Sequence, residues 1–414
     1  MTQLLIAAIA IAAPWVYDRY LGFSTIFANR PGKFENVNHF KSHEVKFRDR
    51  LRNCEDVLVE EEMGIAFLSC NPERDQWNTV MVRSRPLDLP LRAKEFQRDE
   101  GLHMQGAFAS PLDKRDGTDS PHIWIYDYST PNILDSDALK PLVLTDYNNA
   151  ADFQPLGIEF DAATSTLYVV NHSRNSGNLI EVFQVSVQNS VARYVQTLKH
   201  PLIHTPNSIH SLGDGKLLVT NDHYIGALVS PFISQVETFS GIPGGSVVYT
   251  DVHNLQHTKT LTHVPFANGI AMLNSTTVAV ASSSTMGVNF YNFYSDTISL
   301  YFRKYIRAPS TVDNLFVDSS GKLLLAGHPF APALTAVSKA RANCNVQGLD
   351  EEKGACECTA PSWVGEWSEE EGLKTLYKND GDEFCSSTTL ARDVGRGVSI
   401  VTALYDRGIL VAKG

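Results

Sequence analysis

Short runs of hydrophobic residues recur along most of the chain, and stretches with helical periodicity are scarce. The runs are rich in Val, Ile, Leu and Tyr, and tight turns of Gly, Asp, Asn and Ser separate them, for example at 213–215 and 319–321. Because such residues favour extended backbone and such turns end it, the pattern predicts a chain built mainly of β-strands. The strands are predicted at residues 123–128, 166–171, 216–221, 246–250, 277–282, 322–327 and 397–404.

A five-residue phrase repeats along the chain, in which a small or polar residue precedes an aliphatic residue and a short strand follows. Its copies are residues 63–67, 156–160, 207–211, 268–272 and 313–317. The last four copies begin about 51, 61 and 45 residues apart, a period that is typical of propellers and solenoids. The repeats therefore indicate blades of one architecture.

Several copies open a strand pair with a tight turn, most clearly at 207–221 and again at 313–328. The count of pairs reaches six if Gly64 and Val398 begin the first and last inner strands. We therefore predict an all-β fold, a six-bladed β-propeller with four-stranded blades and an N-terminal hydrophobic helix. A propeller brings the same position of every blade to one central axis.

Two stretches break this rhythm, at about 72–121 and 332–385. Both are predicted as insertions in a single propeller that spans residues 18–414. Each is either a surface loop, which costs little to accommodate, or a lid over the axial mouth.

The N-terminus carries an apolar run without charge from Leu4 to Val16. At about 13 residues the run is short for a membrane span and suits the core of a signal peptide. Residues 1–17 are therefore a cleaved signal, a signal-anchor or a buried helix. The first two predict the secretory pathway, with the protein extracellular or membrane-anchored, and sequons at Asn171 and Asn274 agree with them.

Composition narrows the classes of partner. Hydrophobic residues make up 43% and charged residues 20%, so a folded core is expected. The net charge of -11 argues against nucleic acid, because phosphate binding needs a basic surface. The same charge is compatible with a divalent cation.

An even number of cysteines, six in all, is predicted to form disulfides in an oxidising compartment. A zinc site is the alternative. The spacing of Cys356 and Cys358 does not match the usual gaps of about two or three residues between zinc ligands, and no paired His lies nearby. Disulfides are therefore favoured.

The lead positions of the repeats carry side-chain oxygens at Asn207, Asn268, Asp313 and Asn314. Each residue alone suits the turn before a strand. As a set on one axis, four hard oxygens match a calcium site, since calcium takes about 6 to 8 oxygen ligands. The neighbouring pair Glu55-Asp56 either supplies further carboxylates or forms a solvated acidic turn.

Several short motifs, taken together and in order, point to one known family. They are Cys54-Glu55-Asp56, Gly64-Ile65-Ala66-Phe67, Val169-Val170-Asn171-His172, Thr220-Asn221-Asp222-His223-Tyr224, Phe266-Ala267-Asn268-Gly269-Ile270, Val312-Asp313-Asn314 and Gly327-His328-Pro329. Through them the chain resembles the serum paraoxonase/arylesterase family from about residue 54 to the C-terminus, apart from the two insertions. The resemblance implies a six-bladed propeller with two calcium ions in its tunnel, hydrolysis of lactones and aryl esters, and a hydrophobic N-terminal leader that is either cleaved or retained.

By position, the resemblance assigns the ligands of the catalytic calcium and of a second, structural calcium. The catalytic ion takes Glu55, Asn207, Asn268, Asp313 and Asn314. The structural ion takes Asp56, the carbonyl of Ile158 and Ser208, where the family has an aspartate. A hydroxyl is a weaker ligand, which puts this second ion in doubt.

The family also places two histidines above the catalytic ion. One corresponds to His172, but Leu156 stands at the other position, so the usual histidine pair is absent. The base is therefore either His172, whose alternative is a structural role, or Asp313, which would act as base or as nucleophile while touching the metal. His223 and His328 are predicted to be pocket-wall residues. The family's ring-closing disulfide is not expected, because the chain ends at Gly414 without a terminal Cys.

Two functions of different classes remain. The first is a calcium-dependent hydrolase of a small hydrophobic lactone or aryl ester, in which the metal activates the carbonyl and water attacks it. The second is a catalytically weak propeller that keeps calcium and binds a lipid-like ligand or a protein. The N-terminus suggests membrane or lipid association in either case. Neither a Gly-x-Ser-x-Gly elbow nor a His-Glu-x-x-His motif occurs.

Overall fold

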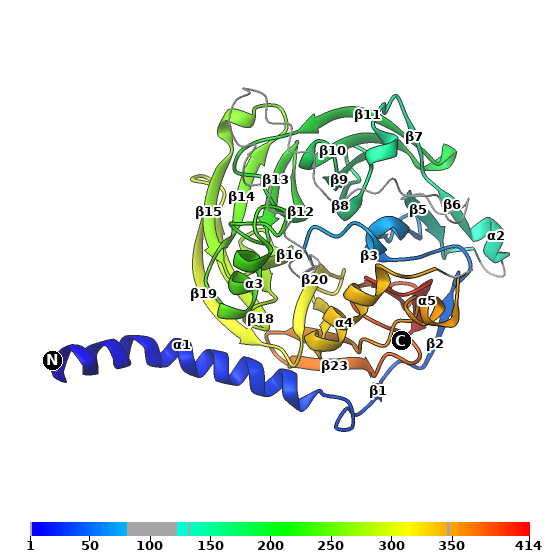
Figure 1. Ribbon diagram of the computed structural model, residues 1–414. Helices are drawn as coiled ribbons and strands as arrows, with labels where there is room; N and C mark the ends of the chain where they lie inside the picture. The colour runs from blue at the N-terminus through cyan, green and yellow to red at the C-terminus, as the bar shows by residue number, and fades with distance from the viewer. Residues whose placement is uncertain (1, 81–121, 131–132, 346–347) are drawn as a thin grey trace, which may run out of the picture.

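Six sheets surround a central axis, and their strands pair antiparallel except for one parallel strand at the outer edge of the second sheet (Figure 1). The computed structural model describes residues 2–80, 122–130, 133–345 and 348–414, with side chains from residue 12 onward. Each sheet is one blade, and four of the six have four strands while two have five. The predicted six-bladed β-propeller with an N-terminal helix is confirmed.

The blades follow one another along the chain, and each begins with its innermost strand. Blade 1 contains β3 (Cys54–Glu60), β4 (Ile65–Cys70), β5 (His122–Asp127) and β6 (Leu139–Pro141). Blade 2 contains β8 (Pro155–Asp161), β9 (Thr166–Ser173), β10 (Gly177–Ser186) and β11 (Val191–Leu198), with β7 (Val143–Thr145) at its outer edge. Blade 3 contains β12 (Pro206–Gly213), β13 (Lys216–Asn221), β14 (Gly245–Asp251) and β15 (Lys259–Val264).

The second half of the ring has the same order. Blade 4 contains β16 (Ala267–Asn274), β17 (Thr277–Ser282), β18 (Gly287–Tyr294) and β19 (Ser299–Arg307). Blade 5 contains β20 (Thr311–Val317), β21 (Leu323–His328), β22 (Ser362–Ser368) and β23 (Gly372–Asn379), with β1 (Val37–Asn38) at its edge. Blade 6 contains β24 (Ser387–Asp393), β25 (Val398–Ala403) and β26 (Ile409–Lys413), and β2 (Ser42–Lys46) completes it.

The ring closes because a strand from the N-terminal region joins the last blade. β2 pairs antiparallel with β26, from Ser42 opposite Lys413 to Lys46 opposite Ile409. Closure removes the open edge that a blade of three strands would expose. It also ties the two ends of the propeller to each other.

Hydrophobic clusters lie between neighbouring blades. One contains Phe67 and Ile125 from blade 1 together with Leu167 and Phe183 from blade 2. The inner strands are thus covered on both faces, which explains why the sequence shows continuous apolar runs and little alternation.

The inner strands share a bulge where each meets the axis. Their pairing with the second strand shifts register at the positions of the repeated phrase, for example between Pro206 and Ile209 of β12 and between Val312 and Leu315 of β20. A bulge turns a side chain out of the regular pleat. The same shift falls between Cys54 and Asp56 of β3.

Two sequence assignments of inner strands were wrong. The phrase at 63–67 lies in the turn before β4 and in β4 itself, the second strand of blade 1. Val398 likewise begins β25, the second strand of blade 6. Both are turn-then-strand segments, so their local pattern copies that of an inner strand. In blade 1 the axial position belongs to Glu55.

Two glycines of the phrase lie where adjacent inner strands approach closely. A Cβ at Gly157 would lie 2.2 Å from the carbonyl oxygen of Asn207, and one at Gly269 would lie 2.4 Å from the amide nitrogen of Leu315. Because these neighbours are backbone, they cannot move aside without displacing the next strand. The glycines therefore set the spacing of the strands that carry Asn207 and Asn314.

Gly269→Ala is therefore expected to lower the free energy of unfolding by about 1–3 kcal/mol, the usual cost of overpacking. Thermal denaturation measures this loss. Gly354→Ala is the matched control, because a Cβ there meets nothing within 4 Å. Equal melting temperatures for Gly269→Ala and the wild type would contradict the close approach.

All six cysteines form disulfides, as the sequence predicts. The pairs are Cys54–Cys70, Cys344–Cys356 and Cys358–Cys385. The first joins β3 to β4, so Cys54 does not need a C-terminal partner.

The two predicted insertions have different outcomes. The first begins with the short helix η1 (Pro72–Asp75), and residues 81–121 lie outside the described residues. The second contains α4 (Ala331–Arg341) and α5 (Asp350–Gly354), but residues 362–379 form the outer strands β22 and β23 of blade 5. The predicted boundary at 385 was therefore too late, because the acidic turn between these strands obscured their pattern.

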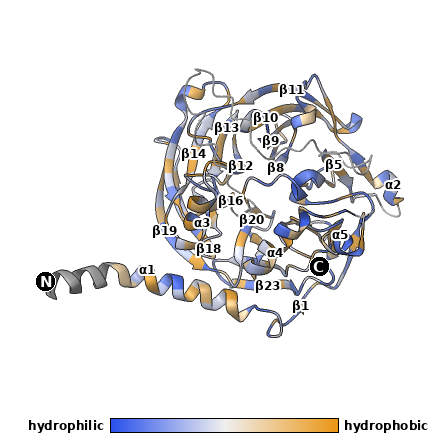
Figure 2. Ribbon diagram, in the orientation of Figure 1, coloured by the Kyte–Doolittle hydropathy of each residue, from blue (hydrophilic) through white to orange (hydrophobic). Residues whose placement is uncertain are grey.

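The helix α1 (Thr2–Ala28) contains the whole apolar run and continues past residue 17 without a break. Figure 2 shows it as a long helix at the side of the ring. Its C-terminal half is hydrogen bonded to the propeller: Trp15 Nε1 donates to the carbonyl of Ser240 at 2.8 Å, and Asn29 Nδ2 donates to that of Pro309 at 2.9 Å. No helix among the described residues is both long and apolar enough to cross a membrane.

Candidate metal centre and active site

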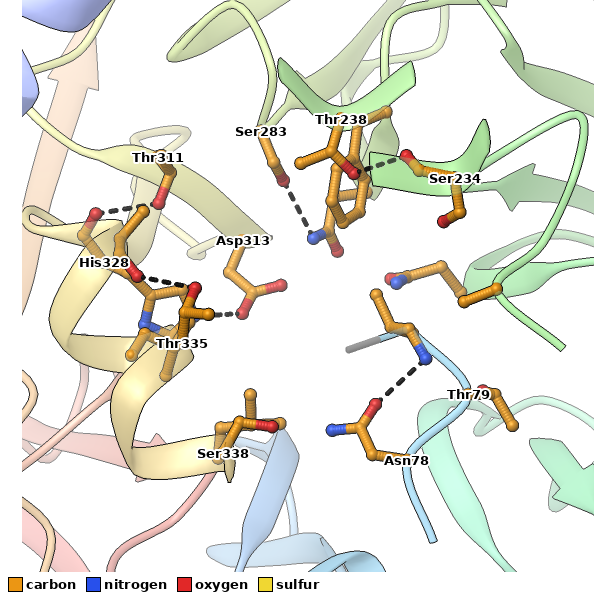
Figure 3. Close-up of a pocket in the computed structure, with 18 of the residues that line it drawn as sticks. Asn78, Thr79, Ser234, Thr238, Ser283, Thr311, Asp313, His328, Thr335 and Ser338 are labelled. Atoms are coloured by element: carbon orange, nitrogen blue, oxygen red, sulfur yellow. Dashed lines mark hydrogen bonds and ion pairs between the residues drawn. The ribbon is translucent and has the colours of Figure 1, made fainter. Parts of the chain in front are cut away.

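A cavity of about 200 Å³ opens at one end of the axis. The first residues of the inner strands form its floor. Its rim comes from α1, from α3 (Pro231–Ser240), from α4 and from the segment that follows η1. Figure 3 shows side chains from these elements around the cavity, including Thr238 of α3 and Thr335 of α4. The second predicted insertion thus does contribute to the axial mouth.

The structure brings four of the five predicted catalytic-calcium ligands together at the floor of this cavity, and the fifth, Asn314, is bonded to one of them. Glu55, Asn207, Asn268 and Asp313 line it. Asn314 is next to Asp313 and donates from Nδ2 to Glu55 Oε1 at 2.8 Å. These five come from four different blades, so the convergence depends on the propeller and not on local sequence.

Four of these five residues hold a buried oxygen without a hydrogen-bond partner among the described residues. They are Glu55 Oε2, Asn207 Oδ1, Asn268 Oδ1 and Asn314 Oδ1. Unpaired buried polar atoms are costly, and few occur in a folded protein. Here they are gathered at one point, which fits a hard cation such as calcium.

Hydrogen bonds donated by asparagine amide nitrogens explain why the amide oxygens of these asparagines are left toward the cavity. Asn268 Nδ2 donates to Ser283 Oγ at 3.1 Å, and Asn314 Nδ2 also donates to Thr389 Oγ1 at 3.0 Å. With the nitrogens held by the protein, the amide oxygens are left for a ligand.

The electrostatics of the floor favour a cation. Burial, reinforced by the nearby carboxylates of Asp56 and Asp313, raises the pKa of Glu55 well above its usual range. A bound divalent ion would offset this penalty. Within the described part of the chain no cluster of three His, Cys, Asp or Glu side chains is suited to a metal. The predicted calcium ligands do not form such a cluster because most of them are asparagines.

The predicted residues of the second calcium also meet, in a separate cavity of about 180 Å³ lined by Asp56, Ile158 and Ser208. Here no oxygen is left unpaired on Asp56. Its carboxylate accepts from the amides of Val57 and Ile158, both at 2.9 Å, and from Thr389 Oγ1 at 3.0 Å. Burial raises the pKa of Asp56 to about 6. The second ion stays a prediction with weaker support than the first.

His172 lies at the cavity but has both ring nitrogens occupied. Nε2 is 2.7 Å from the carbonyl oxygen of Pro206, and Nδ1 is 2.5 Å from Thr79 Oγ1. Since a carbonyl only accepts, Nε2 carries the proton and Nδ1 accepts from the threonine. Burial lowers the pKa of His172. This arrangement supports the structural alternative for His172.

Leu156 is buried beside it and packs with Tyr168, Val170 and Ile180. Leu156 also lines the cavity, so the position of the missing histidine joins the cavity wall to the apolar core between blades 2 and 3.

His328 is bonded to the ligand set, which sequence reasoning did not anticipate. Its Nε2 is 2.9 Å from Asp313 Oδ2, and its Nδ1 is buried without a partner among the described residues (Figure 3). Asp313 therefore has one oxygen held by His328 and the other directed to the cavity. His223, predicted to be a pocket-wall residue, is not among the described residues that line the cavity; its Nε2 lies 2.8 Å from Oγ1 of Thr238, which does line it.

Arg74 is the other cavity residue that the sequence did not indicate. It is buried, and its guanidinium NH2 donates to the carbonyl of Pro155 at 3.0 Å. No repeat or motif marks it, because it belongs to the insertion after β4.

The sequons differ in exposure. Asn171 is buried, with Nδ2 bonded to Tyr147 and Glu181 at 3.2 Å each, so the folded protein has no room for a glycan there. Asn274 is exposed in the turn between β16 and β17. Only the second sequon is suited to modification.

A model of the family named Arylesterase matches residues 123–346. This chain belongs to the arylesterase family. Calcium is typical of this family.

Curated proteins similar to this chain include serum paraoxonases. The chain is 29% identical to serum paraoxonase/arylesterase 2 of Canis lupus familiaris over 187 residues, 44% of this chain and 51% of that protein. It is also 29% identical to serum paraoxonase/arylesterase 1 of Mus musculus, over 51% of this chain and 62% of the relative. The chain thus spans about half the length of the curated relatives it matches.

Solved structures agree on the fold. A protein described as a candidate gluconolactonase superposes with a TM-score of 0.50 at 10% identity, covering 91% of this chain and 94% of its own. At that identity the likeness shows the propeller and nothing about activity.

Proposed function

We propose that this arylesterase-family protein is a calcium-dependent hydrolase of lactones or aryl esters. The observation that carries the proposal is the group of four unpaired, buried oxygens at the cavity floor. With Asp313 they would hold one calcium. When bound, the ion would act as a Lewis acid on the carbonyl and stabilise negative charge on its oxygen.

The remaining residues bind substrate and move the proton. Apolar side chains such as Phe23, Phe266 and Met286 line the cavity and suit a small hydrophobic ester or lactone. Asp313 is placed to take the proton of the attacking water, because His328 fixes one of its oxygens and leaves the other toward the cavity. His172 is saturated with hydrogen bonds and serves to hold Thr79 and the strand of Pro206.

A catalytically weak propeller that binds a lipid-like ligand is the second candidate. Leu156 in place of a histidine favours it, together with the saturated ring of His172. Both candidates keep the calcium, so only turnover separates them.

The disulfides and the similarity to serum paraoxonases indicate the secretory pathway. We also propose that the N-terminal helix contacts lipid. Its exposed residues include Trp15, Tyr17 and Tyr20, and α3 exposes Phe232 and Val236. Exposed apolar area of this extent is typical of surfaces that meet a membrane or another molecule.

Metal removal tests the enzyme proposal. Purified protein with calcium is expected to hydrolyse phenyl acetate or a member of a lactone panel, and EGTA is expected to reduce the rate about a hundredfold or more. Added calcium should restore the rate. Circular dichroism in EGTA checks that the loss is not unfolding. No turnover across the panel by folded, calcium-loaded protein would exclude the hydrolase and leave the binding propeller.

A further inference from the structure

Arg74 occupies an unusual position for a guanidinium. It belongs to η1, which leads from β4 to the cavity, and it is 4% exposed. It lines the cavity together with Glu55 and Asp313. A charge placed so deep normally has a carboxylate partner.

The neighbouring carboxylates are taken by other cations. Glu73 accepts from Arg174 NH2 at 2.6 Å, and Asp75 pairs with Arg52 and Arg341. Arg74 itself forms no ion pair with a described residue. Among the described residues only its NH2 has a hydrogen-bond partner, the carbonyl of Pro155, and its NH1 is buried without a partner there.

The charge of Arg74 persists in this environment. Burial lowers its pKa, whereas the nearby Glu55 raises it, and a guanidinium keeps its proton in proteins. A divalent ion on Glu55 and Asp313 would be neutralised by those two carboxylates. The positive charge of Arg74 would then have no counter-charge among the described cavity residues, and its NH1 would still have an N–H group to donate.

We propose that Arg74 binds an anionic group of the substrate, so that the preferred substrates are esters or lactones carrying a carboxylate. This inference rests on the proposed hydrolase function. Arginine is suited to the task, because its hydrogen bonds to carboxylates are charge-assisted and directional. Arg74 would thus be a specificity residue that contacts substrate away from the reacting carbonyl.

A matched pair of substrates tests the proposal. para-Acetoxybenzoate and its methyl ester release similar phenols and differ in one negative charge. Arg74→Gln is expected to lower kcat/KM for the carboxylate about tenfold to a hundredfold, the usual value of a charged hydrogen bond. It should lower kcat/KM for the methyl ester far less, because that substrate offers Arg74 no carboxylate. An equal loss on both substrates, or no loss on either, overturns the proposal.

Two further variants complete the design. Arg303→Gln removes the same charge from the exposed face of β19 and should change neither substrate. Arg74→Lys keeps the charge and most of the packing, and it should retain part of the preference for the carboxylate. It replaces Arg74→Gln in the comparison if the glutamine variant does not fold.

Binding separates this inference from the proposed activity. Calorimetry with para-hydroxybenzoate and calcium-loaded protein needs no turnover, and Arg74→Gln should weaken that binding at least tenfold. If the wild type binds para-hydroxybenzoate through Arg74 but hydrolyses nothing, the hydrolase proposal fails and the anion site stands. Binding that is absent in the wild type, or unchanged in Arg74→Gln, overturns the anion site.

Discussion

Glu55→Gln is expected to abolish calcium-dependent hydrolysis while leaving the calcium-free protein at least as stable as the wild type. The Glu55 carboxylate is buried, and one of its oxygens has no described partner. Its charge is therefore unfavourable without a cation and needed with one. Glutamine keeps the size of the side chain and the acceptor for Asn314 Nδ2.

The measurement is thermal unfolding in EGTA and in calcium, with the hydrolysis rate beside it. Wild type should gain stability on adding calcium, because a ligand that binds only the folded state stabilises it. The variant should lose most of this gain and about a hundredfold or more of the rate. A variant that keeps the full calcium-induced shift would show that Glu55 is not a ligand.

Glu159→Gln is the matched control, because Glu159 is a second carboxyl of the axial tunnel outside the ligand set of the catalytic ion. Burial raises its pKa to about 8. The pKa of a glutamate in the unfolded chain is about 4.3. As the pH rises from that value through 8, the unfolded chain releases this proton before the folded protein does, so the contribution of this group to stability is lost. In EGTA, the stability of Glu159→Gln should depend less on pH than that of the wild type. Glu159→Gln should also keep the stabilisation by calcium, whereas Glu55→Gln should lose it.

The sequence sufficed for the architecture because each blade repeats one local pattern of turn and strand. It did not suffice where pairing is non-local. The contact of β2 with β26 joins segments from opposite ends of the chain and has no signature in either. The inner strand of blade 1 was misplaced for a related reason, since the turn before β4 imitates the repeated phrase.

The convergence of the predicted ligands could be foreseen because most of them occupy the same phase of a repeat, and the family resemblance indicated the remaining position, Glu55. That they bind calcium stays a prediction. Residues from the insertions were not predictable. Thr79 saturates His172, and Arg74 faces the cavity, yet both come from a segment without a repeat to place it. The orphaned Nδ1 of His328 likewise appears only after folding brings it to Asp313.

Asp313→Asn is expected to reduce kcat about a hundredfold or more even with calcium at saturation, as for the loss of a general base. Asparagine preserves the shape and one oxygen for the metal. His328 can move its proton to Nδ1, which is unpartnered among the described residues, and accept from the new amide through Nε2. Folding should therefore survive, and the melting temperature checks that it does.

Loss of activity alone does not tell a base from a ligand, because the variant also removes a charge from the metal shell. Adding Asn268→Asp returns one negative charge to the same floor from the neighbouring blade. This double variant is expected to recover calcium affinity, measured by calorimetry, and to remain slow. Asn268→Asp alone is the control for the effect of that substitution. If the double variant regains the wild-type rate, Asp313 serves the metal only, and the proton must leave by another group.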